Sequence, residues 1–360
     1  MPAPSRYQRQ ALLEPIGEAG QRRLGRSSAL VVGCGALGTV AAELLARAGV
    51  GRLVIVDRDV VELTNLHRQV LFDEADASES LPKAEAARRK LEAINADIAI
   101  EAHVADFTAA AEPITAGVDV IVDGTDNFET RFLLNDLAVK RSTPYIYAGA
   151  VGTRGTMQVV LPRSAEGATA WEAAGIAGPC LRCLVDAGAG PGAGGPSCDT
   201  VGVLGPLTAA IAAMQAAEAI KLLVGDLDAV SRDLLAVDLW TNGFRRIDAS
   251  AMADPDCPCC AHRRFDYLEG GAGSSTAALC GRNAVQVSPE SPGRNVDFAA
   301  VADRLAGVGV VDANRFTLKA TIEAAGRSHE LTLFRDGRAI IANTEDPALA
   351  RSLYSRYVGL

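Results

Sequence analysis

The sequence lacks any dense run of lysine and arginine. Its 35 Lys and Arg residues are outnumbered by 44 Asp and Glu residues, which gives a formal net charge of −9. Proteins that bind nucleic acid normally carry a basic patch or stripe that neutralises phosphates. We therefore expect no nucleic-acid partner, and the acidic excess alone identifies no other partner.

Long uninterrupted apolar stretches are also missing. No stretch reaches the roughly 18–20 residues of a membrane span without a charge or a turn residue. Residues 1–17, MPAPSRYQRQALLEPIG, lack the apolar core of a secretory signal. We expect a cytoplasmic protein with no membrane partner, whose eight cysteines stay reduced and form no disulfide scaffold.

Histidine clusters and internal repeats are absent as well. The four histidines are scattered, at positions 67, 103, 262 and 329, so no histidine-based site is visible. What the chain does have is length and apolar content. Its 360 residues, 49% of them hydrophobic, can bury the core of one large α/β domain and of a smaller one.

Apolar strand patterns alternate with helical patterns from residue 29 to residue 149. This rhythm predicts a mostly parallel, doubly wound α/β sheet. Further strands are expected at 157–162, 233–240 and 244–249. Between them, residues 206–225 (PLTAAIAAMQAAEAIKLLVG) are apolar around most of a helix, which predicts burial in the core or at a subunit interface.

Composition also suggests the domain boundaries. We expect an N-terminal helical segment at 1–28, the α/β domain at 29–268, a flexible linker at 269–280 and a small α+β domain at 281–360. That small domain contains an Asp-Gly turn between two strands, in FRDGR, and helical patterns at 297–307 and 347–358. Residues 186–199 are rich in Gly and Pro and predict a mobile loop.

A glycine-rich turn follows the first strand, as GCGALG at 33–38. Gly33, Gly35 and Gly38 let the backbone turn sharply, approach phosphates and pack the next helix on the sheet. Asp57 ends the following strand, where a carboxylate can accept hydrogen bonds from ribose. These features alone favour an NAD-dependent oxidoreductase of the Rossmann type, and a glycine turn without any ligand is the alternative.

Polar residues beyond the strand ends shift this balance toward a nucleoside triphosphate. Arg and Lys neutralise phosphates, and Asp at a strand end can hold Mg²⁺. Taken one at a time, each of these residues is best interpreted as a solvated charge in a loop. Taken together, they follow the carboxyl ends of strands, where open α/β sheets bind ligands. They are Asp59, Asn65, Arg68, Gln69, Lys83, Asp123, Asp126 and Asn127.

The motifs GCGALG, DRDVVELTNLHRQ, LPKAEAA and DGTDN, in this order, resemble those of the ThiF/MoeB/HesA adenylyltransferases, bacterial relatives of the ubiquitin-activating enzymes. The resemblance runs from about Tyr7 to Cys260. It implies a Rossmann-like sheet of the ubiquitin-activating-enzyme type, with ATP and Mg²⁺ as cofactors. It also implies adenylylation of the C-terminal Gly-Gly of a ubiquitin-like sulfur-carrier protein, with release of pyrophosphate.

The resemblance also implies residue roles. The glycine loop would hold ATP, Asp57 and Asp59 would belong to the nucleotide site, and the loop after them would line the phosphates. Arg68 and Lys83 would stabilise the triphosphate and the departing pyrophosphate. The implied nucleotide-binding residues are Gly33, Gly35, Ala36, Gly38, Asp57, Asp59, Thr64, Asn65, Leu66, His67, Arg68 and Lys83, with Asp126 on Mg²⁺ and Asn127 beside it.

Arg9, in YQRQ, matches a family arginine that reaches into the neighbouring subunit's site, which implies a homodimer. A fully solvated Arg9 is the alternative. Attack of a carboxylate on a phosphate needs charge neutralisation and alignment more than an acid or a base. The competing interpretations of the chain are an NAD-dependent oxidoreductase and a non-catalytic dimeric scaffold.

Two Cys-x-x-Cys pairs, CLRC and CPCC, lie far apart in the chain. Their ligand type suits tetrahedral Zn²⁺, but classical zinc ribbons have closer pairs. The resemblance implies a structural zinc bound by Cys180, Cys183, Cys257 and Cys260. A redox pair and unrelated buried cysteines are the alternatives, and Cys259 could compete as a ligand.

Three further cysteines need separate interpretations. Cys198 lies in the expected mobile loop, where some family members join the carrier covalently; a dispensable exposed thiol is the alternative. Cys34 is expected to be a packing residue, and Cys280 is either a sulfur relay or a buried thiol. Residues 281–360 contain no cysteine and are too few for a rhodanese domain. Sulfur would then come from a separate donor, a cysteine desulfurase or a rhodanese.

Overall fold

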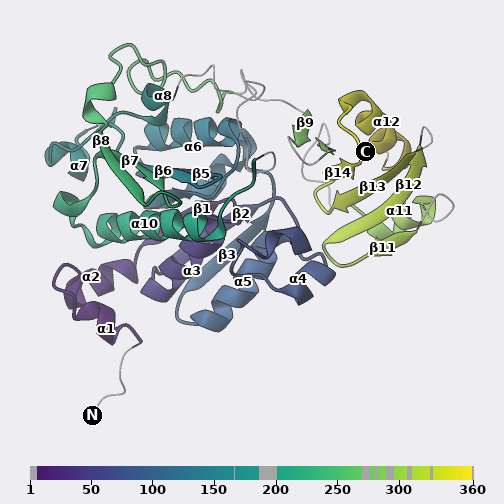
Figure 1. The fold of residues 1–360 in the computed structure, drawn as a ribbon, viewed down its shortest axis with the longest axis horizontal. Coiled ribbons are helices and arrows are strands. Elements are labelled where there is room, and N and C mark those ends of the chain that lie inside the picture. Colours follow the sequence, from purple (N-terminus) through teal and green to yellow (C-terminus); the bar gives the residue numbers. More distant parts are fainter. Residues whose placement is uncertain are drawn as a thin grey trace. The chain divides into compact units, whose positions relative to one another are not determined.

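The computed structural model describes residues 6–165, 167–185, 201–269, 276–279, 283–288, 296–305, 310–324 and 327–358. The chain divides into two compact units, Met1–Ala272 and Gly273–Leu360 (Figure 1). The division falls within the linker expected at 269–280. The expected mobile loop 186–199, which contains Cys198, lies outside the described residues, as does Cys280.

An eight-stranded sheet in the order β3-β2-β1-β4-β5-β6-β7-β8 forms the centre of the first unit. Its first five strands run parallel, and the last three add antiparallel pairs. Strand β1 is buried at every residue, as a strand covered on both faces must be. The strands are β1 (Ser28–Val32), β2 (Arg52–Asp57), β3 (Ala99–Val104), β4 (Val120–Asp123), β5 (Tyr145–Val151), β6 (Arg154–Val160), β7 (Asp233–Asp238) and β8 (Gly243–Asp248).

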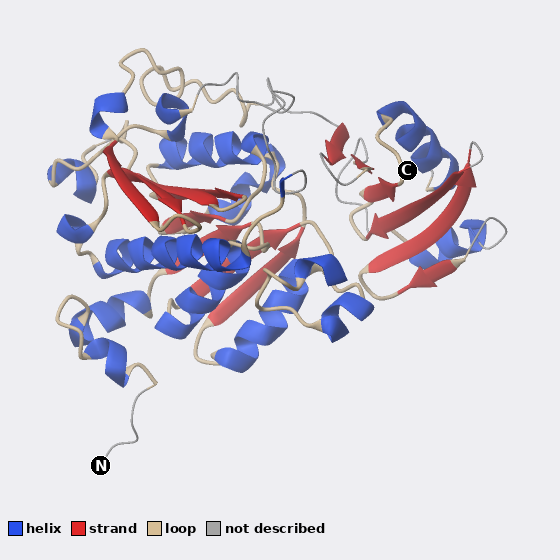
Figure 2. Ribbon diagram, viewed as in Figure 1, coloured by secondary structure: helices blue, strands red, loops and turns tan. Residues whose placement is uncertain are grey.

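Helices cover both faces of this sheet (Figure 2). On one face lie α2 (Gly17–Leu24), α3 (Gly38–Ala48), α5 (Lys83–Ile94) and α10 (Gly205–Val224), and on the other lies α6 (Phe128–Arg141). The predicted doubly wound, Rossmann-like α/β class is therefore confirmed. Shorter helices are α1 (Gln8–Ala11), α4 (Glu74–Ser78), α7 (Ala170–Ala173) and α8 (Leu181–Leu184), with 3₁₀ turns η1 (Leu63–Asn65), η2 (Ala109–Thr115), η4 (Leu227–Ala229) and η5 (Ser250–Met252).

Helix α10 is the predicted apolar helix. By length and composition alone it could cross a membrane, with a mean hydropathy of 1.5. In the fold it packs on β4, β5 and β6 and against α2 and α3, so it is a core helix of the first unit. Its Gln215 amide is buried and donates to the carbonyls of Asp123 and Ile146, which fixes the helix to the strand ends.

The second unit is a six-stranded antiparallel sheet in the order β11-β12-β13-β14-β10-β9, packed with α11 (Phe298–Leu305) and α12 (Pro347–Tyr357). Its strands are β9 (Thr276–Leu279), β10 (Ala284–Val287), β11 (Val311–Ala313), β12 (Thr317–Ala324), β13 (Arg327–Phe334) and β14 (Ala339–Ala342). The predicted Asp-Gly turn connects β13 to β14. Strand β9 corrects one expectation, because residues 276–279 pair with β10 and are not linker. Such a short run beside Gly and Ser gives no clear strand pattern.

Candidate nucleotide-binding site and metal centre

The order of the strands reverses between β1 and β4. From β1 the sheet grows outward through β2 and β3, and the chain then returns to place β4 on the other side of β1. In open α/β sheets, ligands bind outside the carboxyl ends of the strands at such a switch point. The glycine loop 33–38 follows β1 and the sequence DGTDN, 123–127, surrounds the end of β4. Two of the predicted motifs therefore meet at this switch point.

Three glycines of these two loops, Gly33, Gly38 and Gly124, are required by direct backbone contact. A Cβ on Gly38 would lie 1.8 Å from the carbonyl oxygen of Gly33, and a Cβ on Gly124 would lie 2.1 Å from the same atom. Gly33 also has φ +84°, a left-handed conformation that favours glycine. Helix α3 begins here without a side-chain cap, and the Thr39 N–H of its first turn donates to the carbonyl of Gly35 at 3.0 Å. A helix N-terminus of this kind is suited to an anion.

Asp57 is held by backbone donors at the end of β2. One carboxylate oxygen accepts from Cys34 N–H at 2.6 Å, and the other accepts from Asp59 N–H at 2.7 Å. Burial raises the pKa of Asp57, and the ammonium of Lys83 opposes that shift. The carboxylate therefore ties the glycine loop to the loop after β2. Cys34 is fully buried, as a packing residue is expected to be.

Lys83 lies at the first position of α5 and is 3% exposed. Its Nζ donates to Asp59 Oδ2 at 3.1 Å, and its backbone N–H donates to the carbonyl of Asp59 at 2.9 Å. Arg58 lies beside this pair, 3.8 Å from Asp59 and 3.3 Å from Asp106. Cationic and anionic side chains thus alternate at the carboxyl end of β2.

The loop TNLHR forms η1 and the turn after it. Asn65 is buried, and its Oδ1 accepts from Glu62 N–H at 3.2 Å. Arg68 donates to the carbonyl of Thr64 at 3.0 Å, and a ring nitrogen of His67 lies 3.1 Å from the same oxygen. Leu66 is half-buried in this turn. A Cβ on Gly205 would lie 2.8 Å from the carbonyl oxygen of His67, so the start of α10 packs directly against the turn.

Asp126 is exposed beyond β4, while Asn127 caps α6 by accepting from Thr130 N–H at 2.9 Å. Below them, buried Asp123 accepts from Tyr145 Oη at 2.6 Å. Arg131, which we did not single out from the sequence, donates to the carbonyls of Thr125 and Ala148 from a buried position. In the sequence, the one indication that Arg131 supports this loop is its position one helical turn after the N-cap residue Asn127. Together these bonds fix the loop that presents Asp126.

Two sequence-predicted residues, Arg9 and Cys198, are not placed in this constellation, whereas Ala36 is part of it. Arg9 lies exposed on α1, on the surface of the first unit. Ala36 lies within the glycine loop, half-buried. Cys198 cannot be placed, because it lies outside the described residues. The others predicted for the nucleotide site lie on the loops after β1, β2 and β4 or at the start of α5.

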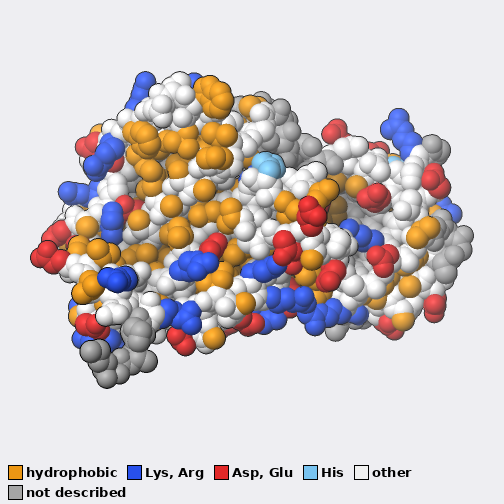
Figure 3. Space-filling model, turned by 60° about the horizontal axis from the view of Figure 1, so that its bottom comes forward, with side chains coloured by type: hydrophobic (Ala, Val, Ile, Leu, Met, Phe, Trp, Pro, Cys, Tyr) orange, Lys and Arg blue, Asp and Glu red, His pale blue; other side chains and the backbone are white. Residues whose placement is uncertain are grey.

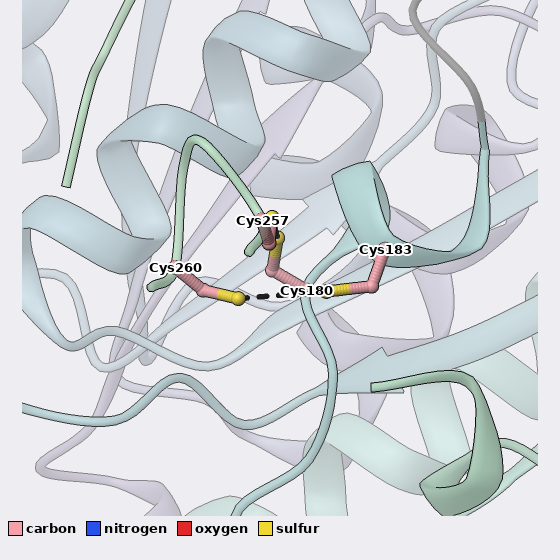
Figure 4. A group of neighbouring side chains, drawn as sticks. All are labelled: Cys180, Cys183, Cys257 and Cys260. Carbon is pink, nitrogen blue, oxygen red and sulfur yellow. Dashed lines mark hydrogen bonds between the residues drawn. The ribbon is translucent and has the colours of Figure 1, made fainter. Parts of the chain in front are cut away.

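The four predicted metal-ligand cysteines come together (Figure 4). Their Sγ atoms all lie within 4.8 Å of one another. Cys180 and Cys257 are 3.7 Å apart at sulfur, and Cys183 and Cys260 are 3.5 Å apart. A zinc ion about 2.3 Å from each of four tetrahedral sulfurs would place them about 3.8 Å apart. The cluster therefore fits one tetrahedral metal ion.

Helix α6 supports both cysteine pairs. Asn135 Oδ1 accepts from Leu181 N–H at 2.8 Å, and its Nδ2 lies 3.2 Å from Cys259 Sγ. Asp136 accepts from Tyr267 N–H at 2.9 Å. Cys259 thus contacts α6 and is not one of the four clustered sulfurs.

Comparison with curated proteins finds relatives that match most of the chain. The sulfur carrier protein ThiS adenylyltransferase of Bacillus subtilis (strain 168) is 39% identical over 356 residues, covering 98% of this chain and 99% of the relative. A sulfur carrier protein adenylyltransferase of Thermus thermophilus is 39% identical over 256 residues, covering 71% of this chain and 90% of the relative. The first alignment includes the second unit.

Solved structures share the fold. A crystal structure of Escherichia coli MccB with MccA-N7isoASN has a TM-score of 0.59 at 22% identity, covering 72% of this chain and 75% of that one. The structure of MccB with ATP has a TM-score of 0.56 at 21% identity and the same coverage. At these identities the likeness concerns the fold alone. The model of the ThiF family matches residues 7–259, and with the full-length relative this shows that the chain belongs to the ThiF family, as the sequence motifs predicted.

Proposed function

We propose that this protein uses ATP to adenylylate the C-terminal glycine of a ubiquitin-like sulfur-carrier protein, releasing pyrophosphate, as a step in sulfur transfer. The observation that carries the proposal is the 39% identity to a ThiS adenylyltransferase across 98% of this chain and 99% of that one. The oxidoreductase alternative has no comparable support. A cytoplasmic location remains a prediction.

The residues at the switch point suit the substrate. Gly33, Gly38 and Gly124 let the two loops pack backbone to backbone, and Gly35 is the loop glycine proposed for close approach to the phosphates. The uncapped start of α3 adds N–H donors for an anion. We assign the positive charge there to Lys83, which acts on Asp57 beside the glycine loop, and to Arg68 of the loop after β2.

The reaction then needs no acid or base. The carrier's terminal carboxylate, ionised at neutral pH, attacks the α-phosphorus; the bond from that phosphorus to the bridging oxygen breaks, and pyrophosphate leaves. The glycine loop and the start of α3 orient the phosphates. Lys83 and Arg68 neutralise the charge that gathers on the leaving group. Mg²⁺ held by Asp126 would supply further positive charge across the phosphates.

We propose Zn²⁺ as the ion of the four-cysteine cluster, with a structural role. The sulfurs are buried or half-buried on the α6 side of the sheet, far in sequence from the glycine loop. A closed set of four thiolates leaves no open position for substrate, which is typical of structural zinc. The ion would tie the segment after β6 to the segment after β8.

A homodimer with Arg9 serving the neighbouring site is also proposed. Hydrophobic side chains gather on the face of the first unit that contains α10 (Figure 3). The outward residues of α10 that support this surface are apolar: Ala209, Ala213, Met214, Ala217 and Ile220 are half-buried or exposed. Arg9 and the exposed Leu12 and Leu13 belong to the adjoining N-terminal segment. Sedimentation equilibrium of the purified protein tests this assembly.

Cys198 is proposed as a covalent acceptor of the activated carrier. Gly202 and Leu204, which follow Cys198 in the chain, both bond to the backbone of Gly152. The carbonyl of Gly202 accepts from Gly152 N–H at 2.8 Å, and Leu204 N–H donates to the carbonyl of Gly152 at 2.9 Å. Gly152 follows β5, whose carboxyl end shares the sheet edge with the glycine loop. Residues 202–204, which follow the segment with Cys198, are therefore held at this edge of the sheet, and this supports the proposal.

Exchange of labelled pyrophosphate into ATP tests the proposed function. Purified protein should catalyse exchange only when a Gly-Gly-ended carrier is present. Exchange should survive in a Cys198→Ala variant, which is expected to lose sulfur transfer alone. Absence of exchange with carriers of several sulfur pathways would contradict the proposal.

A further inference from the structure

Gln69, the last residue of the DRDVVELTNLHRQ motif, lies against the glycine loop. It is 3% exposed, and its Nε2 lies 3.8 Å from the point that a Cβ on Gly35 would occupy. The carbonyl oxygen of Gly124 lies 4.0 Å from the same point. The amide is therefore at the switch point, between the loop after β1 and the loop after β4.

The backbone of Gln69 is fixed while its amide is not. Its N–H donates to the carbonyl of Asn65 at 3.0 Å, and its carbonyl accepts from Phe72 N–H at 3.2 Å. Within the described part of the chain, the side-chain amide makes no hydrogen bond, and Oε1 is fully buried. Burying an unpaired amide costs stability, so such a group needs an explanation.

Other buried glutamines of the first unit differ from Gln69 in that their side-chain Nε2 atoms make hydrogen bonds. Gln158 and Gln215 also leave Oε1 without a partner. Their Nε2 atoms nevertheless donate to backbone carbonyls, that of Gln158 to Val159 at 2.9 Å. Their amides are thus anchored to the strands. The Gln69 amide makes no such bond, and its donor faces the loop glycine whose role is close approach to phosphate.

The geometry points to Gln69 as a substrate-binding residue whose Nε2 donates a hydrogen bond to a phosphate oxygen of ATP at Gly35. This rests on the proposed use of ATP and adds a residue to that site. A neutral donor here orients the phosphate chain without competing with Lys83 and Arg68 for charge. The cost of the unpaired amide is offset when the nucleotide binds.

Replacing the amide by an apolar group of similar size tests this directly. Equilibrium binding of ATP and of adenosine to full-length protein is measured by calorimetry, without carrier, for wild type, Gln69→Met and the control Gln158→Met. Thermal unfolding of each protein is followed without nucleotide. The phosphate-free ligand separates a lost phosphate contact from a distorted nucleoside pocket.

Gln69→Met should weaken ATP binding about tenfold, the loss of one hydrogen bond to a charged group. It should leave adenosine binding unchanged and should not lower the melting temperature. Gln158→Met should leave the affinity for ATP unchanged. Unchanged ATP affinity in Gln69→Met, or equal losses of ATP and adenosine, would overturn the inference while leaving the proposed function standing. Wild-type protein that binds no ATP would instead refute the proposed function itself.

Discussion

The ammonium of Lys83 lies 3.1 Å from a carboxylate oxygen of Asp59, with 4% and 15% of the two side chains exposed. Lys83 also opposes the burial that raises the pKa of Asp57. One cation therefore holds two carboxylates at the end of β2. We also propose that this ammonium binds the triphosphate. The same side chain would therefore contribute both to the stability of the fold and to catalysis.

The substitution Lys83→Met should impair both catalysis and the stability of the fold. We expect about 100-fold slower pyrophosphate exchange, as for removal of one charge-stabilising donor. We also expect a loss of about 3 kcal/mol in the free energy of unfolding, because buried carboxylates lose their counter-charge. The control Lys90→Met removes a half-exposed cation of the same helix that pairs with Asp73 and Asp76, and should cost about 1 kcal/mol without slowing exchange. Equal effects of the two substitutions in urea unfolding and exchange assays would contradict this role for Lys83.

Gly38→Ala should disrupt the glycine loop. Its Cβ would lie 1.8 Å from the Gly33 carbonyl oxygen, so the loop and the start of α3 must move apart. We expect a loss of about 3 kcal/mol of stability together with loss of ATP binding. Gly178→Ala is the matched control, because its Cβ meets nothing within 4 Å. Denaturant unfolding and ATP calorimetry measure both variants; normal ATP affinity in Gly38→Ala would show that the loop does not bind phosphate.

The cysteine cluster should hold one metal ion per chain. Elemental analysis of protein purified without added metal is expected to find zinc, and Cys257→Ser should lose it and melt earlier. Cys259→Ala removes a neighbouring sulfur that is outside the cluster and should keep the metal. A full complement of zinc in Cys257→Ser, or none in wild type, would disprove the assignment.

Asp136 should make stability depend on pH. Burial raises its pKa to about 6. The folded protein therefore binds this proton more tightly than the unfolded chain, and stability falls as pH rises from about 4 to 6, by about 3 kcal/mol in total. Asp136→Asn keeps an acceptor for Tyr267 N–H and should flatten that fall.

Asp73 serves as the control for this measurement, because its pKa is shifted in the direction opposite to that of Asp136. A hydrogen bond from Lys90 lowers the pKa of Asp73, so its stabilisation is present at higher pH and is lost as the solution becomes acidic. Asp73→Asn should therefore leave the fall between pH 4 and 6 in place. Urea unfolding across this range gives the answer, and an unaltered slope in Asp136→Asn would refute the assignment.

Much of the first unit could be predicted because its strands are continuously apolar and its helices are long. β1, for instance, is buried at every residue and is followed at once by glycines. In the second unit β9 was missed, since four residues beside Gly and Ser carry too little pattern. Sequence separation also hid the cysteine cluster's support by Asn135 and Asp136 of α6.

Site residues were harder to define than site loops. The motifs located the loops after β1, β2 and β4, but which side chain each loop buries depends on packing. Thus Lys83 pairs with Asp59, Asn127 caps a helix, and Arg131 lies under the loop with Asp126. For the cysteines, the Cys-x-x-Cys spacing already favoured Cys257 and Cys260 over Cys259, and the fold adds that the Cys259 sulfur contacts α6.

Transfer of label from ATP to the carrier tests the central claim most directly. Protein, magnesium and a Gly-Gly-ended carrier are incubated with ATP labelled at either the α- or the γ-phosphate, beside a carrier lacking its last glycine. We expect the α-label on the intact carrier, the γ-label in pyrophosphate, and neither on the shortened carrier. Label from the γ-phosphate on the carrier, or α-label on the shortened one, would contradict adenylylation of the terminal glycine.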